Sequence, residues 1–292
     1  MNKLDTPSSS DARRLLWRLS ENRVALAALV FLALVALVAL LAPILAPFDP
    51  DAQDLPRRLE GPSGRNLLGT DDYGRDQLSR LIYGSRISLL AALEVAVVSC
   101  GIGVPLGLVA GFSGRWVDAI LSRINDGLMS VPALIMALTI VAVLGPGLTN
   151  AMLAVGVVFV PRFFRVTRAV TRDIRNETFV EASVALGNTR MRTVLGHVLP
   201  NTMSPIIIEL SILAGTAITA EASLSFLGLG VSPPTASWGG MLSTALNNIG
   251  SAQHLVYPPG IMIAATVLAC TLLGDGLRRA SGRRSNVVGE AL

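Results

Sequence analysis

Long apolar runs constrain this chain more than any other feature of its sequence. The first run, VALAALVFLALVALVALLAPILAPF, covers residues 24–48 and contains no charged residue. A helix of about 20 apolar residues crosses the hydrocarbon core of a bilayer. Five further candidate spans lie at residues 87–112, 127–144, 148–164, 203–226 and 256–273. The pattern predicts an all-α polytopic membrane protein with six transmembrane helices.

Composition supports the same class. Of the 292 residues, 51% are hydrophobic and only 15% are charged, whereas soluble domains carry about 25% charged residues. The first run is longer than the central region of a signal peptide, and Pro43 and Pro47 interrupt it, so we expect it to be retained. Cys100 and Cys270 lie within apolar runs, which favours small buried hydrophobes over a disulfide.

The distribution of basic residues predicts the orientation. With an inside N-terminus, the inner segments hold 18 of the 24 Lys and Arg residues. The outer stretch 49–86 holds six basic residues against seven acids, and the outer stretch 227–255 holds none. Because cytoplasmic loops carry the excess of Lys and Arg, both termini are expected in the cytoplasm of a bacterial cell, with the helices in its inner membrane.

These expectations divide the chain into segments. A cytoplasmic N-terminal segment (1–22) precedes the first transmembrane helix (23–48) and an extracytoplasmic loop (49–86). A core of five helices (87–278) follows, with a cytoplasmic block at 176–201 and an outer loop at 227–255, and residues 279–292 form a cytoplasmic tail.

The 176–201 block is charged and patterned as short helices. It follows an arginine stripe at three- and four-residue steps, which is one face of a helix leaving the membrane; the stripe consists of Arg162, Arg165, Arg168, Arg172 and Arg175. Headgroup anchoring is the simplest interpretation of that stripe. Within the block, Gly187 is expected to end a first helix in a left-handed conformation. Asn188 or Thr189 is expected to cap a second helix, and Pro200 to help stop it.

Two interpretations of such a helix pair stand side by side. An apolar face displayed in the cytoplasm suits a groove on another protein. An amphipathic pair lying on the bilayer surface suits the arginines equally well.

A specific pattern within the block favours the first interpretation. It contains Glu181, Ala182, Ser183, Gly187, Leu199 and Pro200. This arrangement resembles the EAA…G…LP loop of permease subunits in bacterial ATP-binding-cassette (ABC) importers, with Ser183 where alanine is usual, a small-for-small change. Two outer stretches, 67–89 and 221–242, and the helix end LLGDGLR at 273–279 are similar to the dipeptide and oligopeptide permease group, C-type subunit.

The resemblance implies a function and a set of partners. The chain would have the type I ABC importer transmembrane fold and translocate di- or oligopeptides. The residues implied in coupling to an ATPase are Glu181, Ala182, Ser183, Gly187, Arg190, Leu199 and Pro200. The implied partners are a second homologous permease, two ABC ATPase subunits or one fused chain, an extracytoplasmic binding protein and membrane lipid.

Absent motifs narrow the role of this chain. It lacks a G-x-x-x-x-G-K-[ST] phosphate loop, so ATP and Mg²⁺ are expected on the partner ATPases and the chain is not expected to be an enzyme. It shows no catalytic Ser-His-Asp arrangement and no nucleic-acid motif. His197 and His254 are predicted on opposite sides of the membrane, which excludes a metal site built on that pair.

Three glutamates lie at or within the spans, where each needs a partner or a wet cavity. Glu94 is the deepest, and it is expected to contact either a peptide's amino group or the second permease. Glu221 is expected near an interface, with a structural or gating role; Glu94 and Glu221 are the candidates for the translocation pathway. Glu209 is the third, and Asp126 is expected to pair with a nearby arginine. Glycines 103, 107 and 111 favour close packing of another helix.

The sequence is also compatible with other transported solutes and with other classes of membrane protein. Nickel, glutathione and other small solutes are handled by close relatives of the group. A self-sufficient secondary transporter is the alternative class, although the sequence lacks visible inverted repeats of broken helices. A purely structural scaffold would leave the intramembrane glutamates without a role.

Overall fold

The computed structural model describes residues 22–281, so the predicted segments 1–22 and 279–292 lie almost wholly outside it. Helices form all the regular elements of the described residues. The long helices are α2 (Arg23–Leu40), α4 (Gln77–Phe112), α5 (Arg115–Met129), α6 (Ala133–Leu144), α7 (Leu148–Arg175), α10 (Leu199–Phe226), α11 (Trp238–Asn247) and α12 (Tyr257–Ala280). The short elements are α3 (Ala42–Leu45), η1 (Leu55–Arg57), α8 (Thr178–Ala185), α9 (Arg190–Thr193), η2 (Val194–Val198) and η3 (Gln253–Leu255).

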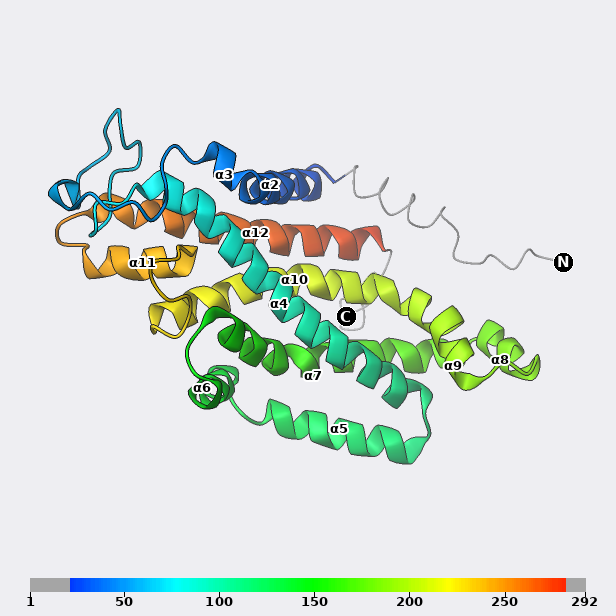
Figure 1. The fold of residues 1–292 in the computed structure, drawn as a ribbon. Coiled ribbons are helices and arrows are strands. Elements are labelled where there is room, and N and C mark those ends of the chain that lie inside the picture. The colour runs from blue at the N-terminus through cyan, green and yellow to red at the C-terminus, as the bar shows by residue number, and fades with distance from the viewer. Residues whose placement is uncertain (1–21, 282–292) are drawn as a thin grey trace, which may run out of the picture.

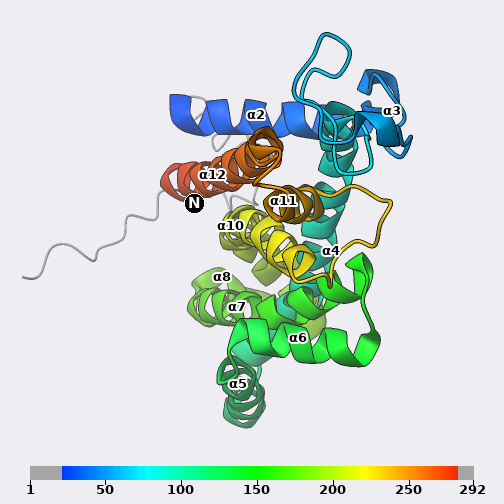
Figure 2. The same cartoon turned by 90° about the vertical axis from the view of Figure 1, so that its left-hand side faces the viewer.

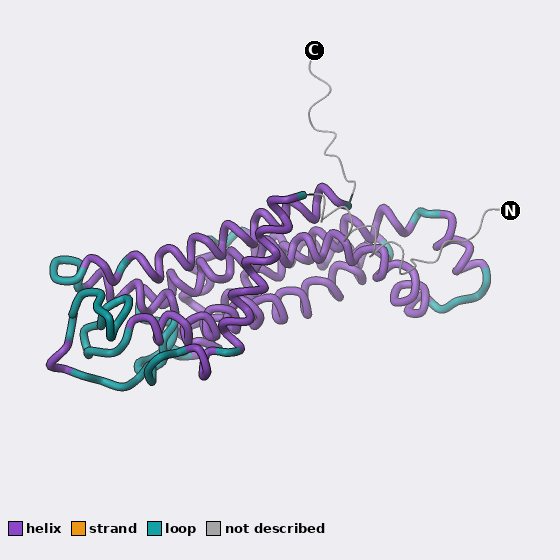
Figure 3. The backbone as a smooth tube through the Cα atoms, turned by 90° about the horizontal axis from the view of Figure 1, so that it is seen from above, coloured by secondary structure: helices purple, strands orange, loops and turns teal. Residues whose placement is uncertain are grey.

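The helices form an elongated bundle. Helices α4, α7, α10 and α12 run along its length, with α5 on the flank below α7 and α2 beside α12 (Figure 1). Figure 2 views the bundle from one end, where α11 and the loop after α3 lie over the helix ends. Irregular loops gather at that end, whereas α8 and α9 extend from the opposite end (Figure 3).

The α4–α7 pair has the most extensive contact in the bundle, and a row of glycines permits it. A Cβ atom added at Gly103, Gly107 or Gly111 would lie 2.6–2.7 Å from a Cβ atom of α7. The backbones therefore approach as closely as glycine allows, and the predicted packing role of these glycines is confirmed.

Four helices are long and apolar enough to span a bilayer, and a bent pair raises the count to five. The prediction of one continuous span over Gly127–Leu144 is wrong, because α5 and α6 meet at an angle of 89°. Val131 precedes Pro132, and the proline ring disfavours the α conformation of the residue before it, so the helix breaks there. Helix α7 carries five arginines and falls outside this count; six spans therefore stay a prediction.

Several elements extend beyond their apolar cores. Helix α4 begins at Gln77, so the last ten residues of the stretch expected as an outer loop, 49–86, are helical. Asp76 caps this helix by accepting a hydrogen bond from the Ser79 amide at 2.8 Å. The stretch expected as an outer loop, 227–255, contains α11, which Ser237 caps. Hydropathy marks only the apolar part of each helix, whereas the polar caps set its true end.

Candidate coupling and translocation sites

Two short helices form the 176–201 block at one end of the bundle. Helix α8 ends before Gly187, whose φ of +84° is left-handed, as predicted. The Gly187 amide donates to the Val184 carbonyl at 3.0 Å, and the Asn188 amide donates to the Ser183 carbonyl at 3.2 Å. The side chain of Thr189 then caps α9 by accepting from the Arg192 amide at 3.4 Å. The predicted turn between two helices is confirmed.

The prediction that Pro200 stops the second helix is wrong. Helix α9, which begins at Arg190, continues through the π-helical turn η2 into α10. Within that turn the Leu199 amide donates to the carbonyl of Val194, five residues earlier. Pro200 has no amide hydrogen and its ring would clash with a carbonyl four residues earlier, so a wider turn accommodates it. Leu199 and Pro200 therefore form the first turn of α10.

The block presents an apolar surface outside the packed core. Only four of its side chains are buried, namely Val180, Ser183, Thr193 and Val198. By contrast, Leu186 is 84% exposed and Met191 is 69% exposed, and Glu181 and Ala182 lie on the exposed side as well. Large apolar side chains exposed on both short helices make this block a candidate surface for interaction.

A hydroxyl network that sequence reasoning missed joins the two short helices. The buried hydroxyls of Ser183 and Thr193 lie 3.2 Å apart, and the Asn188 amide nitrogen donates to Ser183 Oγ at 3.1 Å. The only signal in the sequence was a serine where alanine is usual. Ser183 is thus more than a small residue, because its hydroxyl fixes α8 against α9.

Three arginines of the stripe on α7, namely Arg165, Arg168 and Arg172, form ion pairs with aspartates of α5. Arg168 forms a two-pronged ion pair with Asp118, with Nη2 and Oδ2 2.7 Å apart. Arg165 pairs with Asp126 at 3.1 Å, which confirms the partner expected for that aspartate. The Arg175 guanidinium donates to the Ser113 carbonyl at 3.0 Å. The stripe therefore ties α5 to α7, in addition to any role at headgroups.

Two of the three glutamates in the spans form an ion pair or a short hydrogen bond within the chain. Glu209 of α10 forms an ion pair with Arg162 of α7. Glu221, fully buried in α10, accepts from the Ser225 hydroxyl at 2.7 Å and from the Ser88 hydroxyl of α4 at 3.5 Å. Both carboxylates thus join neighbouring helices.

Glu94 differs from the other two. One oxygen, Oε1, accepts a long hydrogen bond of 3.5 Å from the Thr149 hydroxyl at the start of α7. The other, Oε2, is buried and has no hydrogen-bond partner among residues 22–281. An intramembrane carboxylate with an unpaired oxygen is a binding-site candidate by its energetics alone.

Residues 49–76 form a compact cap with α11 at the end of the bundle opposite α8 and α9 (Figure 1). Buried Asp71 contacts Arg75 at 2.7 Å and Arg80 at 3.3 Å. Arg80 also donates to the carbonyls of Pro50 at 3.1 Å and Pro234 at 3.2 Å, so one guanidinium joins two distant segments. Burial, and then the neighbouring carboxylate of Asp71, raise the pKa of Asp72 above its ordinary value.

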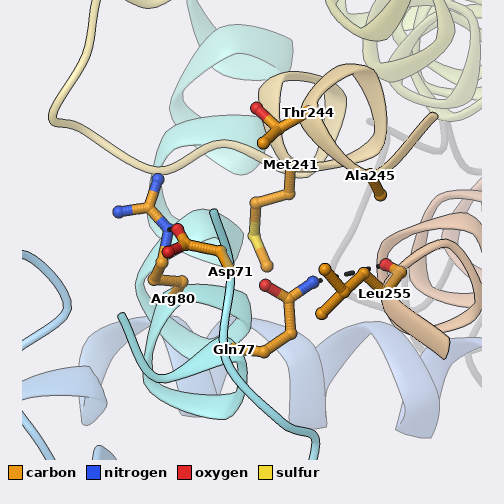
Figure 4. A pocket seen from close by; sticks show the side chains of 7 residues that line it. All are labelled: Asp71, Gln77, Arg80, Met241, Thr244, Ala245 and Leu255. Atoms are coloured by element: carbon orange, nitrogen blue, oxygen red, sulfur yellow. Dashed lines mark hydrogen bonds and ion pairs between the residues drawn. The ribbon is translucent and has the colours of Figure 1, made fainter. Parts of the chain in front are cut away.

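Figure 4 shows Asp71 and Arg80 at the edge of a small cavity within this cap. The cavity has a volume of about 10 Å³, which is the space of a single water. Gln77 closes one side and donates to the Leu255 carbonyl at 3.3 Å. The described part of the chain brings no three His, Cys, Asp or Glu side chains together as a metal site.

Two family descriptions match the chain. Residues 103–287 match "Binding-protein-dependent transport system inner membrane component". Residues 10–62 match "N-terminal TM domain of oligopeptide transport permease C".

Individual relatives agree with these matches over nearly the full length. The di/tripeptide transport system permease protein of Pseudomonas aeruginosa is 44% identical over 267 residues, which cover 89% of this chain and 88% of that protein. The glutathione transport system permease protein of Pectobacterium atrosepticum is 39% identical, covering 91% and 89%.

Among solved structures, the inward-facing MetNI methionine ABC transporter contains a chain with the same fold. The TM-score is 0.57 at 19% identity, covering 70% of this chain and 97% of that chain. The expected type I importer fold is therefore confirmed, as is a multi-pass membrane protein.

Proposed function

The chain belongs to the family of binding-protein-dependent transport system inner membrane components, and on that premise we propose that it is the C-type permease subunit of an ATP-driven importer of short peptides. The match to the permease C N-terminal domain and the 44% identity to a di/tripeptide permease support this proposal. Glutathione, which a 39% identical relative transports by its name, is a second candidate substrate and is itself a peptide.

The observation that carries the mechanism is the exposed apolar surface of the 176–201 block. Leu186 and Met191 project from two helices whose mutual angle is fixed by Ser183 and Gly187. A rigid pair of this kind suits a groove on an ATPase subunit. Glu181 anchors the contact at its charged edge, with Ala182 allowing close approach and Arg190 flanking it.

Movement of the ATPases reaches the membrane through the π-helical turn. Because η2 joins α9 directly to α10, a displacement of the block is transmitted to α10 without an intervening loop. ATP and Mg²⁺ bind to the ATPases, and this chain supplies neither a nucleotide site nor a catalytic residue. The transmembrane helices then switch between an inward-facing and an outward-facing packing, and ATP binding shifts the equilibrium between the two.

The remaining partners follow from the same proposal. A second permease completes the pathway, two ATPase subunits or one fused chain dock at the block, and a binding protein delivers peptide at the cap. The excess of arginines on the α8–α9 side supports a cytoplasmic location for that side and for both termini.

An affinity purification tests the proposal. The chain, tagged at its C-terminus, is extracted from its native membrane in mild detergent, and its stoichiometric partners are identified by mass spectrometry. We expect a second permease and a Walker-motif ATPase, and loss of the ATPase alone from a Glu181→Arg/Gly187→Asp variant. Recovery of the chain alone, with solute uptake by that chain in liposomes, would contradict the proposal and favour a secondary transporter.

A further inference from the structure

Helix α4 has two faces of opposite character. One face carries the glycine row 103, 107 and 111 and is packed against α7. The other carries Arg86, Leu90, Glu94, Val97 and Gly101, which follow at three- and four-residue steps and so share one side of the helix. Leu90 is 48% exposed and Val97 is 63% exposed, and nothing lies within 4 Å of a Cβ added at Gly101. On this second face, the open face of α4, the residues other than Glu94 are exposed, whereas Glu94 is half-buried and accepts a hydrogen bond from Thr149.

The open face begins in a groove and carries one charge of each sign. A groove of about 320 Å³ lies at its cap end, with Asp51, Tyr83, Arg86, Leu90 and Thr235 among its lining residues. Arg86 is exposed and has no ion pair or hydrogen bond among residues 22–281. Glu94 lies eight residues further along α4, which corresponds to about 12 Å at a rise of about 1.5 Å per residue.

Neither Arg86 nor Glu94 has an ion-pair partner among the described residues. Asp71 and Arg75 satisfy one another in the cap, and Glu209 and Glu221 have partners within the bundle. The buried Oε2 atom of Glu94 has no hydrogen-bond donor among the described residues. Glu209 Oε1 also lacks a hydrogen bond, but it forms an ion pair with Arg162, whereas Glu94 has no ion pair within residues 22–281. The terminal torsion of a glutamate is broad and roughly two-fold, so either oxygen can turn toward the open face. Lipid tails cannot supply the donor that such a carboxylate requires.

A short peptide carries the complementary charges. Near neutral pH its carboxyl group is ionised and its amino group is largely protonated, with ordinary pKa values near 3.5 and 8. An extended chain covers about 3.3–3.6 Å per residue, so three residues span about 10 Å. That length matches the separation of Arg86 and Glu94 once the reach of the flexible arginine side chain is included.

We propose that the open face of α4 binds the peptide substrate, with its carboxylate at Arg86 and its ammonium at Glu94. This inference rests on the proposed function. It assigns a direction to entry: the amino end of the peptide moves into the membrane first, while the carboxyl end stays in the groove beside the cap. Thr149 orients the Glu94 carboxylate from α7 and leaves the second oxygen for the ammonium group.

The test uses the complete transporter with its binding protein in proteoliposomes, and uptake of radiolabelled trialanine. Loss of one charge-assisted hydrogen bond corresponds to a drop in uptake of about tenfold or more at subsaturating peptide. We expect this drop for Glu94→Gln and for Arg86→Gln. The charge-retaining controls Glu94→Asp and Arg86→Lys are expected to keep most of the uptake. The subunit composition should be unchanged in all four variants.

The outcomes separate this inference from the function on which it rests. If the unmodified complex imports no trialanine or other short peptide, the proposed function fails. If it imports peptide and both glutamine variants match it, the open face does not bind the substrate. If Glu94→Gln instead releases the second permease, a helix of that subunit covers the face, and the assignment to substrate is overturned.

Discussion

The cap and the 176–201 block lie at opposite ends of the bundle, and their side chains differ in a way that reflects their roles. In the cap, Asp71, Arg75 and Arg80 are buried and paired with one another or with backbone carbonyls. In the block, large apolar side chains such as Leu186 and Met191 are exposed, and the buried contacts are few. The cap therefore pairs its central buried charges internally, whereas the block exposes apolar side chains that a partner can cover.

One chain thus combines a rigid end, the cap, with an end that can move with a bound partner, the 176–201 block. A buried charge network holds its geometry because any displacement leaves charges unpaired. The two short helices of the block are joined to each other by hydroxyl contacts and make few contacts with the bundle. They can therefore move together when a bound ATPase subunit moves.

Removing the central carboxylate of the cap should be the most damaging change. Asp71→Ala leaves the buried guanidinium groups of Arg75 and Arg80 without their shared partner. We expect a loss of about 3–5 kcal/mol in the free energy of unfolding, measured by denaturant unfolding of the purified complex in detergent. Asp72→Asn is the matched control, because Asp72 is more exposed and lies 3.9 Å from Arg75. Equal effects of the two variants would show that the cap is not held by Asp71.

A charge on the apolar surface of the block should weaken assembly and leave the fold intact. Leu186→Asp changes a side chain that is 84% exposed. The free energy of unfolding of this variant should therefore differ from that of the unmodified protein by no more than about 0.5 kcal/mol. Its affinity for the ATPase should fall by about 2 kcal/mol or more, as at interface hot spots. Leu55→Asp, at a 58% exposed position in the cap, is the control and should keep the ATPase bound. Retention of the ATPase by Leu186→Asp would remove this surface from the interface.

Loss of the hydroxyl at Ser183 should loosen α8 from α9. Ser183→Ala leaves the buried Thr193 hydroxyl without the partner at 3.2 Å, which costs about 1–3 kcal/mol. A double-mutant cycle with Thr193→Val checks the pairing, because the second substitution should cost less once the first is made. Strict additivity would mean that the two hydroxyls do not act together.

The turn between the short helices should depend on backbone conformation rather than on space. Gly187 has a φ of +84° and nothing within 4 Å of a Cβ added there. Gly187→Ala should therefore cost about 1–2 kcal/mol through the left-handed conformation alone. Gly196→Ala, also without neighbours but with an ordinary φ, is the control and should be neutral or slightly stabilising. Thermal unfolding of the two variants compares them directly.

The smallest effect should be a pH dependence in the cap. The pKa of Asp72 is raised, chiefly by burial, so its protonated form is favoured in the folded state. The group stabilises the fold below its ordinary pKa, and this contribution is lost as the pH rises through the raised value. Asp72→Asn should thus gain stability relative to the unmodified protein between acidic and neutral pH. An unchanged difference across that range would contradict the shift.

Local signals in the sequence predicted the parts of this structure that depend on local geometry. Glycines spaced four apart required close packing, Gly187 required a left-handed turn, and Thr189 supplied a cap. The features that escaped prediction depend on neighbours or on the path of the backbone. The π-helical turn absorbs Pro200 instead of ending the helix, and the chain bends by 89° before α6.

The same distinction holds for the candidate sites. The intramembrane glutamates were evident as costly charges, but their partners were not, because Arg162 and Ser88 lie on other helices, far away in the sequence. The Ser183 hydroxyl pair joins residues ten positions apart across a turn. Such pairs depend on how the helices pack in the folded bundle, and they leave no periodic pattern in the sequence from which they could be predicted.

Hydrogen exchange tests the central claim most directly. The amide exchange of the permease pair is compared with and without its bound ATPases, by mass spectrometry in the same detergent. We predict that the ATPases slow exchange within residues 178–195 and leave residues 49–76 of the cap unchanged. Unchanged exchange at 178–195, or protection confined to the cap, would contradict the claim that the apolar surface of the block is where the ATPases dock.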